Sequence, residues 1–312
     1  MTAVATEELG TLWKTLRAAR SGIRARDAAR ELGVSEAELV ATTIGDTAVR
    51  LGGGAAGLLH ALPEVGRCMA LTRNEHAVSE VRGRYGGVEL GAHAGQVVGE
   101  HIDLRVFLNH WRHLFAIDEP HPQRRGERRR SIQAFDPSGL AVHKIYLEPD
   151  GNARTWDALV AERTVIAPLV IEPAAARRSE RPQRSDDAID RDALVADWDA
   201  MTDTHEFFHL LARHGATRTQ ALRLAGDGRA RRVTNDSFEH LLHYASASSD
   251  KIMIFVGNRG CIQVFSGSVQ RVVRHGPWIN VMDPEFNLHL RADEIATSWV
   301  VGKPTRSGVV SA

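Results

Sequence analysis

Cysteine, net charge and long apolar runs are all scarce in this sequence. It has two cysteines, Cys68 and Cys261, and neither lies in a Cys-x-x-Cys pair, which excludes a disulfide framework. Its 39 Lys and Arg residues balance 39 Asp and Glu residues, so no bulk field attracts nucleic acid or an anionic membrane. No run approaches the roughly 18 apolar residues of a membrane span, and no secretory signal is recognisable. We therefore expect a cytoplasmic protein with no membrane insertion and no nucleic-acid partner.

What the chain does contain is an internal repeat. Residues 69–83 align without a gap with residues 253–267, which lie 184 positions further along. The aligned pairs are Met69/Met253, Asn74/Asn258, Val78/Ile262 and Gly83/Gly267. A repeat of this kind indicates one structural unit built twice. We predict an N-terminal repeat over 1–172, a polar, Pro-punctuated linker over 173–192 and a C-terminal repeat over 193–312.

Each repeat is predicted to contain helices followed by a sheet. Amphipathic stretches at 12–39 and 194–214 predict the helices, broken near Gly33 and Gly215. Two residue pairs have the spacing of a helix capping box, Ser35 with Glu38 and Thr217 with Gln220. Short alternating runs predict an antiparallel meander at 252–257, 261–265 and 269–274, and further helices are expected at 108–115 and 292–301.

The predicted fold class is therefore α+β, with two tandem structural repeats, each a large antiparallel sheet flanked by α-helices. The first repeat continues through strands at 131–136 and 141–147 and a helix at 154–162. Counterparts 184 positions later would fall beyond residue 312, so the second repeat is expected to lack its last hairpin and helix. That would leave one sheet edge without a neighbour.

The segment 202–209, Thr-Asp-Thr-His-Glu-Phe-Phe-His, is the richest in chemistry. It contains His-Glu-x-x-His, the zinc-hydrolase motif, with His205 and His209 as ligands, Glu206 as base and Glu239 as a conceivable third ligand. A second interpretation is structural, a histidine at a helix start whose aromatic neighbours fill the core. A third is an axial haem ligand, because a helix N-terminus keeps imidazole neutral and able to bind iron. In that case Phe208 would wall a porphyrin and Arg218 would meet its propionates.

Two other segments have competing interpretations. Residues 28–39 have the spacing of a helix-turn-helix, but the acidic Glu36 and Glu38 would repel phosphates, which favours a plain helical hairpin. The basic loop 123–130 is an anion site or, more ordinarily, a solvated loop between strands.

Arg105 and Phe107 lie on one face of a predicted strand, and Leu104 and Val106 lie on the other. An arginine in such a strand is usually an edge or ion-pair residue. The functional alternative is a cavity-lining donor beside an aromatic side chain. Lys303, just before Pro304, is ordinarily a solvated lysine.

With these segments taken together, the chain resembles the bacterial hemin transport or hemin-degrading factor family. The resemblance covers nearly the whole chain. It is carried by segments at 71–75, 91–95, 103–111, 201–208, 256–267, 287–290 and 303–305. It implies a cytoplasmic protein of two repeats that holds haem b (iron protoporphyrin IX) in the C-terminal half.

The resemblance also implies roles for single residues. The histidine of the Thr-Asp-x-His segment, here His205, ligates iron, and the arginine of the Asp-Leu-Arg strand, here Arg105, covers the other haem face with Phe107 nearby. Arg218 and Lys303 correspond to cations near the propionates. Family members carry imported haem, and some open its ring with an electron donor, as a haem oxygenase does. Expected partners are therefore a haem importer, a downstream haem oxygenase or an electron donor.

Two departures from the family limit what is expected. Ser79 stands where some relatives have a histidine linked to a second haem site in the N-terminal half, so no second site is predicted. Tyr, Gln and Arg residues of a segment past residue 312 also help form the haem pocket in the family. We therefore predict a haem carrier or degrader, with Arg105 as the residue that would act on bound oxygen or replace a ligand.

Overall fold

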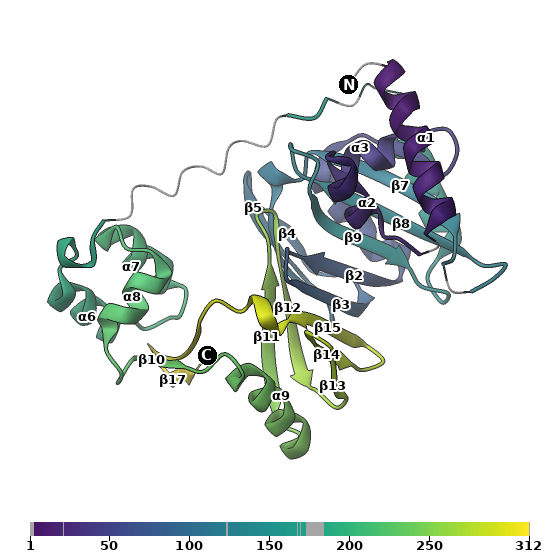
Figure 1. Cartoon of the computed structure of the whole chain (residues 1–312). Coiled ribbons are helices and arrows are strands. Elements are labelled where there is room, and N and C mark those ends of the chain that lie inside the picture. The colour runs from purple at the N-terminus through teal and green to yellow at the C-terminus, as the bar shows by residue number, and fades with distance from the viewer. Residues whose placement is uncertain are drawn as a thin grey trace. The chain divides into compact units, whose positions relative to one another are not determined.

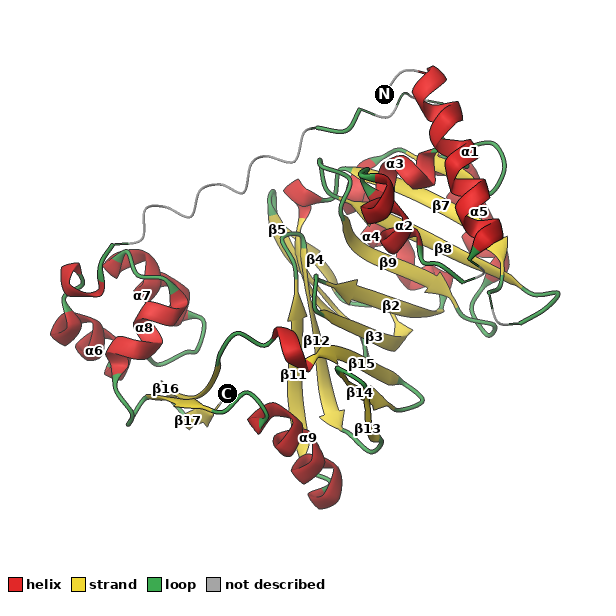
Figure 2. Cartoon of the chain, viewed as in Figure 1, coloured by secondary structure: helices red, strands yellow, loops and turns green. Residues whose placement is uncertain are grey.

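The computed structural model describes residues 3–20, 22–122, 124–166, 168, 170–172 and 184–311 (Figure 1; Figure 2 is coloured by secondary structure). The chain forms two compact units. Unit 1 comprises Met1–Ala175 and Ala245–Arg291, and unit 2 comprises Ala176–Tyr244 and Ala292–Ala312. None of the helices in the described part of the chain is long and apolar enough to cross a membrane.

Unit 1 contains two antiparallel sheets. The larger has nine strands among the described residues, in the order β1 (Ala48–Leu51), β7 (His113–Pro120), β8 (Arg128–Phe135), β9 (Ala141–Leu147), β2 (Arg67–Arg73), β3 (Ala77–Arg84), β15 (Phe286–Arg291), β14 (Trp278–Met282) and β13 (Val272–His275). The other has the order β11 (Lys251–Gly257), β12 (Cys261–Ser268), β6 (Asp103–Phe107), β5 (Ala94–Val98) and β4 (Val88–Leu90). These sheets confirm the predicted α+β class.

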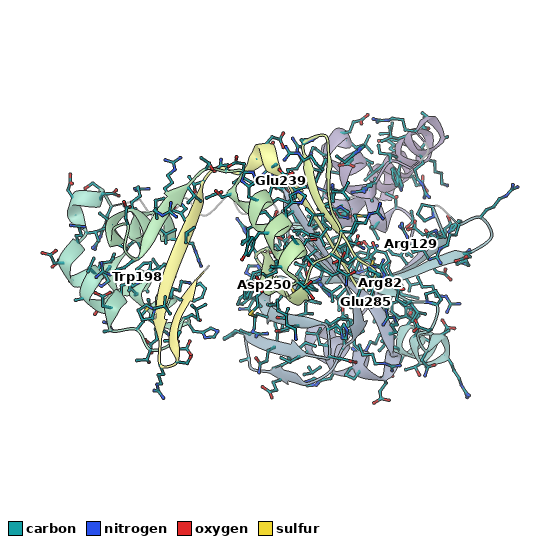
Figure 3. The ribbon with its side chains drawn as sticks, turned by 90° about the horizontal axis from the view of Figure 1, so that it is seen from below. Arg82, Arg129, Trp198, Glu239, Asp250 and Glu285 are labelled. Atoms are coloured by element: carbon teal, nitrogen blue, oxygen red, sulfur yellow. The ribbon has the colours of Figure 1, made fainter. Side chains whose placement is uncertain are left out.

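The two copies of the repeat exchange strands. By the repeat alignment, the hairpin β2–β3 corresponds to β11–β12, and the strands β4, β5 and β6 correspond to β13, β14 and β15. Yet β3 pairs with β15, and β12 pairs with β6, so each hairpin is extended by three strands of the other copy. At the first junction the Arg82 N–H donates to the Glu285 carbonyl at 2.8 Å, and Figure 3 labels both residues.

The two sheets of unit 1 differ at one edge. Beyond β2 the larger sheet continues through β9, β8, β7 and β1, whereas β11, the counterpart of β2, is the last strand of its sheet among the described residues. Met253 and Phe255 of β11 are exposed.

Helices flank the larger sheet (Figure 2). They are α1 (Ala3–Ala19), α2 (Ala25–Leu32), α3 (Glu36–Ala41), α4 (Gly54–Ala61) and α5 (Ala153–Arg163), with 3₁₀ turns η1 (Leu62–Val65) and η2 (Leu108–His110). The predicted capping box is confirmed, because Ser35 accepts from the Glu38 N–H and the Glu38 carboxylate accepts from the Ser35 N–H. Gly33 ends α2 in the left-handed region, at φ 68°.

Unit 2 is a small helical bundle with a short sheet. Its helices are α6 (Arg191–Asp199), α7 (Glu206–His214) and α8 (Arg218–Ala225), and its strands are β10 (Ala230–Val233), β16 (Ser298–Thr305) and β17 (Gly308–Ser311), with turns η3 (Asp186–Ala188) and η4 (Ala292–Glu294). Helix α9 (Ser237–Ser248) runs from unit 2 into unit 1. The second capping box, Thr217 with Gln220, is confirmed, and Gly215 ends α7 as expected.

Several predicted elements are wrong. The helix expected at 108–115 is the turn η2 followed by β7, and the helix expected at 292–301 is η4 followed by β16. Strand β7 lies between β1 and β8, and its residues Leu114 to Ile117 are all buried, without alternation between the two faces of the sheet. A continuous apolar run of that kind does not distinguish a helix from a strand. Strand β13 joins β14 rather than β12, so the meander stops after β11–β12.

The compact units do not follow the repeat boundaries. Residues 245–291 belong to unit 1 because β15 and β12 pair with strands of the first copy. The division into 1–172, a linker over 173–192 and 193–312 describes the duplication, and it stays a prediction. Residues 173–183 of that linker lie outside the described residues.

Candidate functional site

Unit 2 is organised around Trp198 of α6, which Figure 3 labels. Its ring meets Phe207 of α7 edge to face, with centroids 5.1 Å apart. Its indole N–H donates to the Gly302 carbonyl of β16 at 3.0 Å. Because Trp198 is fully buried, these contacts fix the start of α7 against β16, the two elements that carry His205 and Lys303.

His205 is the N-cap residue of α7 rather than a residue of its first turn. The Asp203 carboxylate accepts the His205 backbone N–H at 2.7 Å and lies 2.6 Å from His205 Nδ1. The hydrogen bond from the His205 backbone N–H lowers the pKa of Asp203 most, and the one from the His205 side chain lowers it further. An ionised carboxylate only accepts hydrogen bonds, so Nδ1 must carry the hydrogen. The lone pair of a neutral His205 ring is therefore at Nε2, which has no partner among the described residues. With the side chain 82% exposed, Nε2 is free to bind a metal.

Glu206 does not act as the base of a zinc site. Its carboxylate accepts the Thr202 backbone N–H and the Thr202 hydroxyl, each at 3.0 Å, and so closes the loop before α7. Within the described residues no group of three His, Cys, Asp or Glu side chains is arranged to hold a metal, so His205 and His209 lack a third protein ligand such as Glu239. The zinc-hydrolase alternative is not supported.

Four further side chains gather beside His205. The Arg218 guanidinium lies over Phe207 at 5.4 Å and over Phe208 at 5.6 Å, measured to the ring centroids. The Lys303 ammonium lies 4.5 Å from the Phe207 centroid. Phe208 is 56% exposed, although it is a large apolar side chain. The structure thus brings together His205, Phe208, Arg218 and Lys303, four of the six residues predicted for the site.

The two cations lack acidic partners. Neither Arg218 nor Lys303 forms an ion pair with any described residue. Burial lowers the pKa of Lys303, and the charge of Arg218 lowers it further. Arg218 is also the first residue of α8, where the helix dipole disfavours a cation. Paired positive charges in this setting favour an anionic ligand.

Arg105 and Phe107 lie in unit 1, on β6, inside the five-stranded sheet. Leu104 and Val106 are fully buried, so the predicted alternation is confirmed. Arg105 bonds to Asp103, two residues away on the same strand face, which makes it an ion-pair residue on a central strand rather than an edge residue.

The sequence predictions did not single out Met253 and Phe255, which lie on the same face of the five-stranded sheet as Arg105. Register places Gly257 opposite Ile262 and Ile262 opposite Arg105, so the two exposed side chains, at 253 and 255, share the face of Arg105. Their exposed fractions are 59% and 61%, so they add apolar surface to a face that also carries Lys251, Asp103 and Arg105. The alternation of Lys-Ile-Met-Ile-Phe-Val in β11 was the sequence signal.

In the first repeat, buried and ion-paired side chains occupy the position that corresponds to the Arg218–Lys303 pair. Glu36 follows its capping-box residue as Arg218 follows Thr217, and it is 5% exposed. It pairs with Arg73 and, at 2.5 Å, with the Lys144 ammonium. Ser79 is buried against Gln263 at 3.1 Å.

The other two motifs have structural roles. Residues 28–39 form a helical hairpin whose second helix, α3, is buried along its length, with Glu36, Ala37, Leu39, Val40 and Ala41 inside, so it presents no recognition face. In the β7–β8 hairpin, Arg128 pairs with Asp118, Arg129 with Glu119 and Arg130 with Asp157. Arg124 likewise pairs with Glu127, so these four arginines are matched by local carboxylates; Gln123 lies outside the described residues.

Comparison with known proteins gives consistent matches. A family model described as the haemin-degrading HemS/ChuX domain matches residues 33–162 and 215–312. The hemin transport protein HemS of Yersinia enterocolitica is 43% identical over 298 residues, which are 95% of this chain and 84% of that protein. The hemin transport protein HmuS of Yersinia pestis is also 43% identical, over 300 residues, with the same coverage.

Solved structures agree. The crystal structure of holo-PhuS, a haem-binding protein from Pseudomonas aeruginosa, superposes with a TM-score of 0.93 at 45% identity, covering 98% of this chain and 88% of that one. A structure of the haem-degrading enzyme ChuS of Escherichia coli O157:H7 gives 0.89 at 36% identity, with the same coverage. On this evidence the chain belongs to the haemin-degrading HemS/ChuX family of haem-utilisation proteins.

Proposed function

We propose that this protein binds haem b through His205 in the cytoplasm, after import, and either carries the haem or opens its ring. The observation that carries the proposal is the geometry at the start of α7. Asp203 holds Nδ1 of His205 at 2.6 Å, which orients the exposed ring with Nε2 outward. Iron of haem is commonly bound by one such imidazole.

The side chains around His205 also fit the porphyrin ring and the propionates of haem. The exposed ring of Phe208 offers an apolar surface to a porphyrin, and Arg218 and Lys303 offer positive charge to its two propionates. Bound propionates would relieve the repulsion between these two cations.

Arg105 and Phe107 are proposed as further haem-binding residues, with Arg105 also as the residue that would act in ring opening. Support comes from the resemblance and from the exposed apolar side chains of Met253 and Phe255 on the same sheet face as Arg105 in unit 1. The choice between carrier and degrader rests on the relatives, since one is named a hemin transport protein and another a haem-degrading enzyme. An importer, a downstream haem oxygenase or an electron donor would then be the partner.

A haemin titration followed by absorbance tests the proposal. We expect saturable one-to-one binding, with the Soret band lost or shifted in His205→Ala. His209→Ala is the matched control, because His209 is exposed on the same helix and should leave the spectrum unchanged. The reverse pattern would overturn the ligand assignment. Loss of the haem absorbance after an electron donor is added, absent in Arg105→Ala, would identify a degrader.

A further inference from the structure

A cavity of about 320 Å³ lies in unit 1, apart from the residues discussed so far. Arg50, Gly52, Gly54, Arg112 and His113 are among its lining residues. They come from the end of β1, the N-terminus of α4 and the start of β7, and β1 and β7 are neighbours in the sheet. A volume of this size is near the lower end for small-molecule sites, at about 300 Å³.

The backbone beside this cavity is arranged to meet an anion. Gly53 and Gly54 are consecutive left-handed residues, at φ 77° and 70°, which only glycine adopts readily. They lead into α4 with no side-chain cap on its first N–H groups. Free N–H groups at a helix start, with the helix dipole behind them, bind phosphate and similar anions.

Three guanidinium groups surround this glycine turn. Arg50 and Arg112 line the cavity, and a Cβ built on Gly53 would lie 2.7 Å from Nη1 of Arg163. Neither Arg112 nor Arg163 has an ion pair within the described part of the chain. Burial lowers the pKa of Arg50, and the charge of Arg112 lowers it further. The cations therefore repel one another next to a positive helix end.

His113 adds a second, independent sign of a ligand. Its side chain is only 3% exposed and lines the cavity, yet Nδ1 has no hydrogen-bond partner among the described residues. Nε2 lies 3.4 Å from the Pro137 carbonyl, which can only accept, so Nε2 carries the hydrogen. Burial lowers the pKa of His113, which keeps the ring neutral. Nδ1 is then a buried acceptor that needs an O–H or N–H donor.

We infer that this cavity binds inorganic phosphate, which retains at least one hydrogen at neutral pH, whereas a phosphomonoester is mostly a dianion without an O–H. The anionic oxygens would meet Arg112, Arg50 (whose Nη1 also donates to the Pro168 carbonyl beside the cavity) and the N–H groups at the start of α4, and the P–O–H would donate to Nδ1 of His113. Sulfate has the same shape and charge but no O–H at neutral pH, so it leaves Nδ1 without a donor. The inference is independent of haem binding, since its residues lie in unit 1 and include none proposed for haem.

Isothermal titration of the full chain in chloride buffer tests this, with inorganic phosphate, glycerol phosphate and sulfate as probes. We expect saturable phosphate binding, with sulfate weaker by about tenfold or more because a buried acceptor stays unpaired. Arg112→Gln should weaken phosphate binding by about tenfold. Arg163→Gln should weaken it less, because Arg163 lies beside Gly53 but does not line the cavity. Glycerol phosphate, whose phosphate group mostly lacks an O–H at neutral pH, should also bind more weakly than inorganic phosphate. Tighter binding of glycerol phosphate would contradict the assigned P–O–H donor.

Two control variants keep the test specific. Arg128→Gln removes an arginine of the same sheet that is paired with Asp118, and it should leave phosphate affinity unchanged. Arg218→Gln should do the same, because Arg218 lies in unit 2. The inference is overturned if phosphate binding is not saturable, if sulfate binds equally well, or if Arg218→Gln rather than Arg112→Gln abolishes binding.

Discussion

Asn74 and Asn258, which the internal repeat aligns, make the same hydrogen bond in reverse. Asn74 Nδ2 donates to the Gly257 carbonyl at 3.0 Å, and Asn258 Nδ2 donates to the Arg73 carbonyl at 2.9 Å. Each Oδ1 also accepts two backbone N–H groups of its own turn. The two turns of the duplicated hairpins are thus tied together by one contact made twice.

Asn258→Asp should lower the free energy of unfolding by about 1–3 kcal/mol. It keeps the acceptor but removes the donors to the carbonyls of Arg73 and, at 2.7 Å, Val142, and it sets a negative charge against them. Asn74→Asp loses one donated bond at an exposed site, so its effect should be smaller. Urea unfolding of both variants measures the difference, and equal losses would contradict this account.

Asp203→Ala should weaken haemin binding by about tenfold to a hundredfold, if His205 is the ligand as proposed. The variant removes the carboxylate that fixes the tautomer and orientation of the ring. Asp197→Ala is a matched control, since Asp197 also bonds a histidine, His214 Nε2 at 2.8 Å, but not the ligand. Haemin titration of the two variants gives the comparison. An unchanged affinity in Asp203→Ala would show that the carboxylate does not orient the ligand.

Haemin affinity should fall as pH rises through the lowered pKa of Lys303. Burial, and then the charge of Arg218, depress this pKa below its ordinary value, so the ammonium loses its proton earlier than a solvated lysine would. A neutral amine no longer attracts a propionate. In Arg218→Gln the repulsion is gone, so affinity starts lower but persists to higher pH. Titrations across the alkaline range test this, and an identical pH profile in both proteins would count against it.

Unit 1 should lose stability as pH falls below about 6.5, the ordinary histidine value. Burial lowers the pKa of His143 to about 3. Between these two pH values the unfolded chain therefore binds a proton that the folded chain does not bind. This lowers the free energy of unfolding by up to about 1.4 kcal/mol for each pH unit. Both ring nitrogens already have partners, the Thr72 hydroxyl at 2.8 Å and the Tyr85 hydroxyl at 2.7 Å.

His143→Gln isolates this contribution from the other histidines. Its free energy of unfolding should be lower near neutral pH, and it should fall less steeply between pH 6.5 and 3 than that of the unaltered protein. Denaturant unfolding at several pH values measures both slopes. Parallel curves would mean that His143 is not the group responsible.

Local features were the easiest to predict from the sequence. The capping boxes of Ser35 and Thr217 and the helix breaks at Gly33 and Gly215 depend on neighbouring residues alone, and all four predictions are confirmed. The strand β7 was mistaken for a helix because its apolar run is buried on both faces and has no period to distinguish the two.

Long-range features were harder. The repeat is visible in the amino-acid sequence, but the sequence does not indicate that β3 pairs with β15 instead of with a strand of its own copy. At the candidate site, residue types offered a haem ligand at His205 and a cation at Arg218 as one interpretation, and only the family resemblance implied Lys303. The hydrogen bond from the imidazole to Asp203 depends on the backbone geometry. The cavity proposed for phosphate is lined by Arg50 and Arg112, with Arg163 beside its glycine turn, and these three residues lie far apart in the chain and share no motif.

The exchange of strands between the copies also constrains how the protein is made. When β3 leaves the ribosome, its partner β15 has not yet been synthesised, and β6 likewise waits for β12. Strand edges that will be internal in the finished sheets therefore stay open during much of translation, when they are most prone to aggregate. Slowing synthesis between these strands should lower the yield of native protein, and a chaperone that shields sheet edges should restore it.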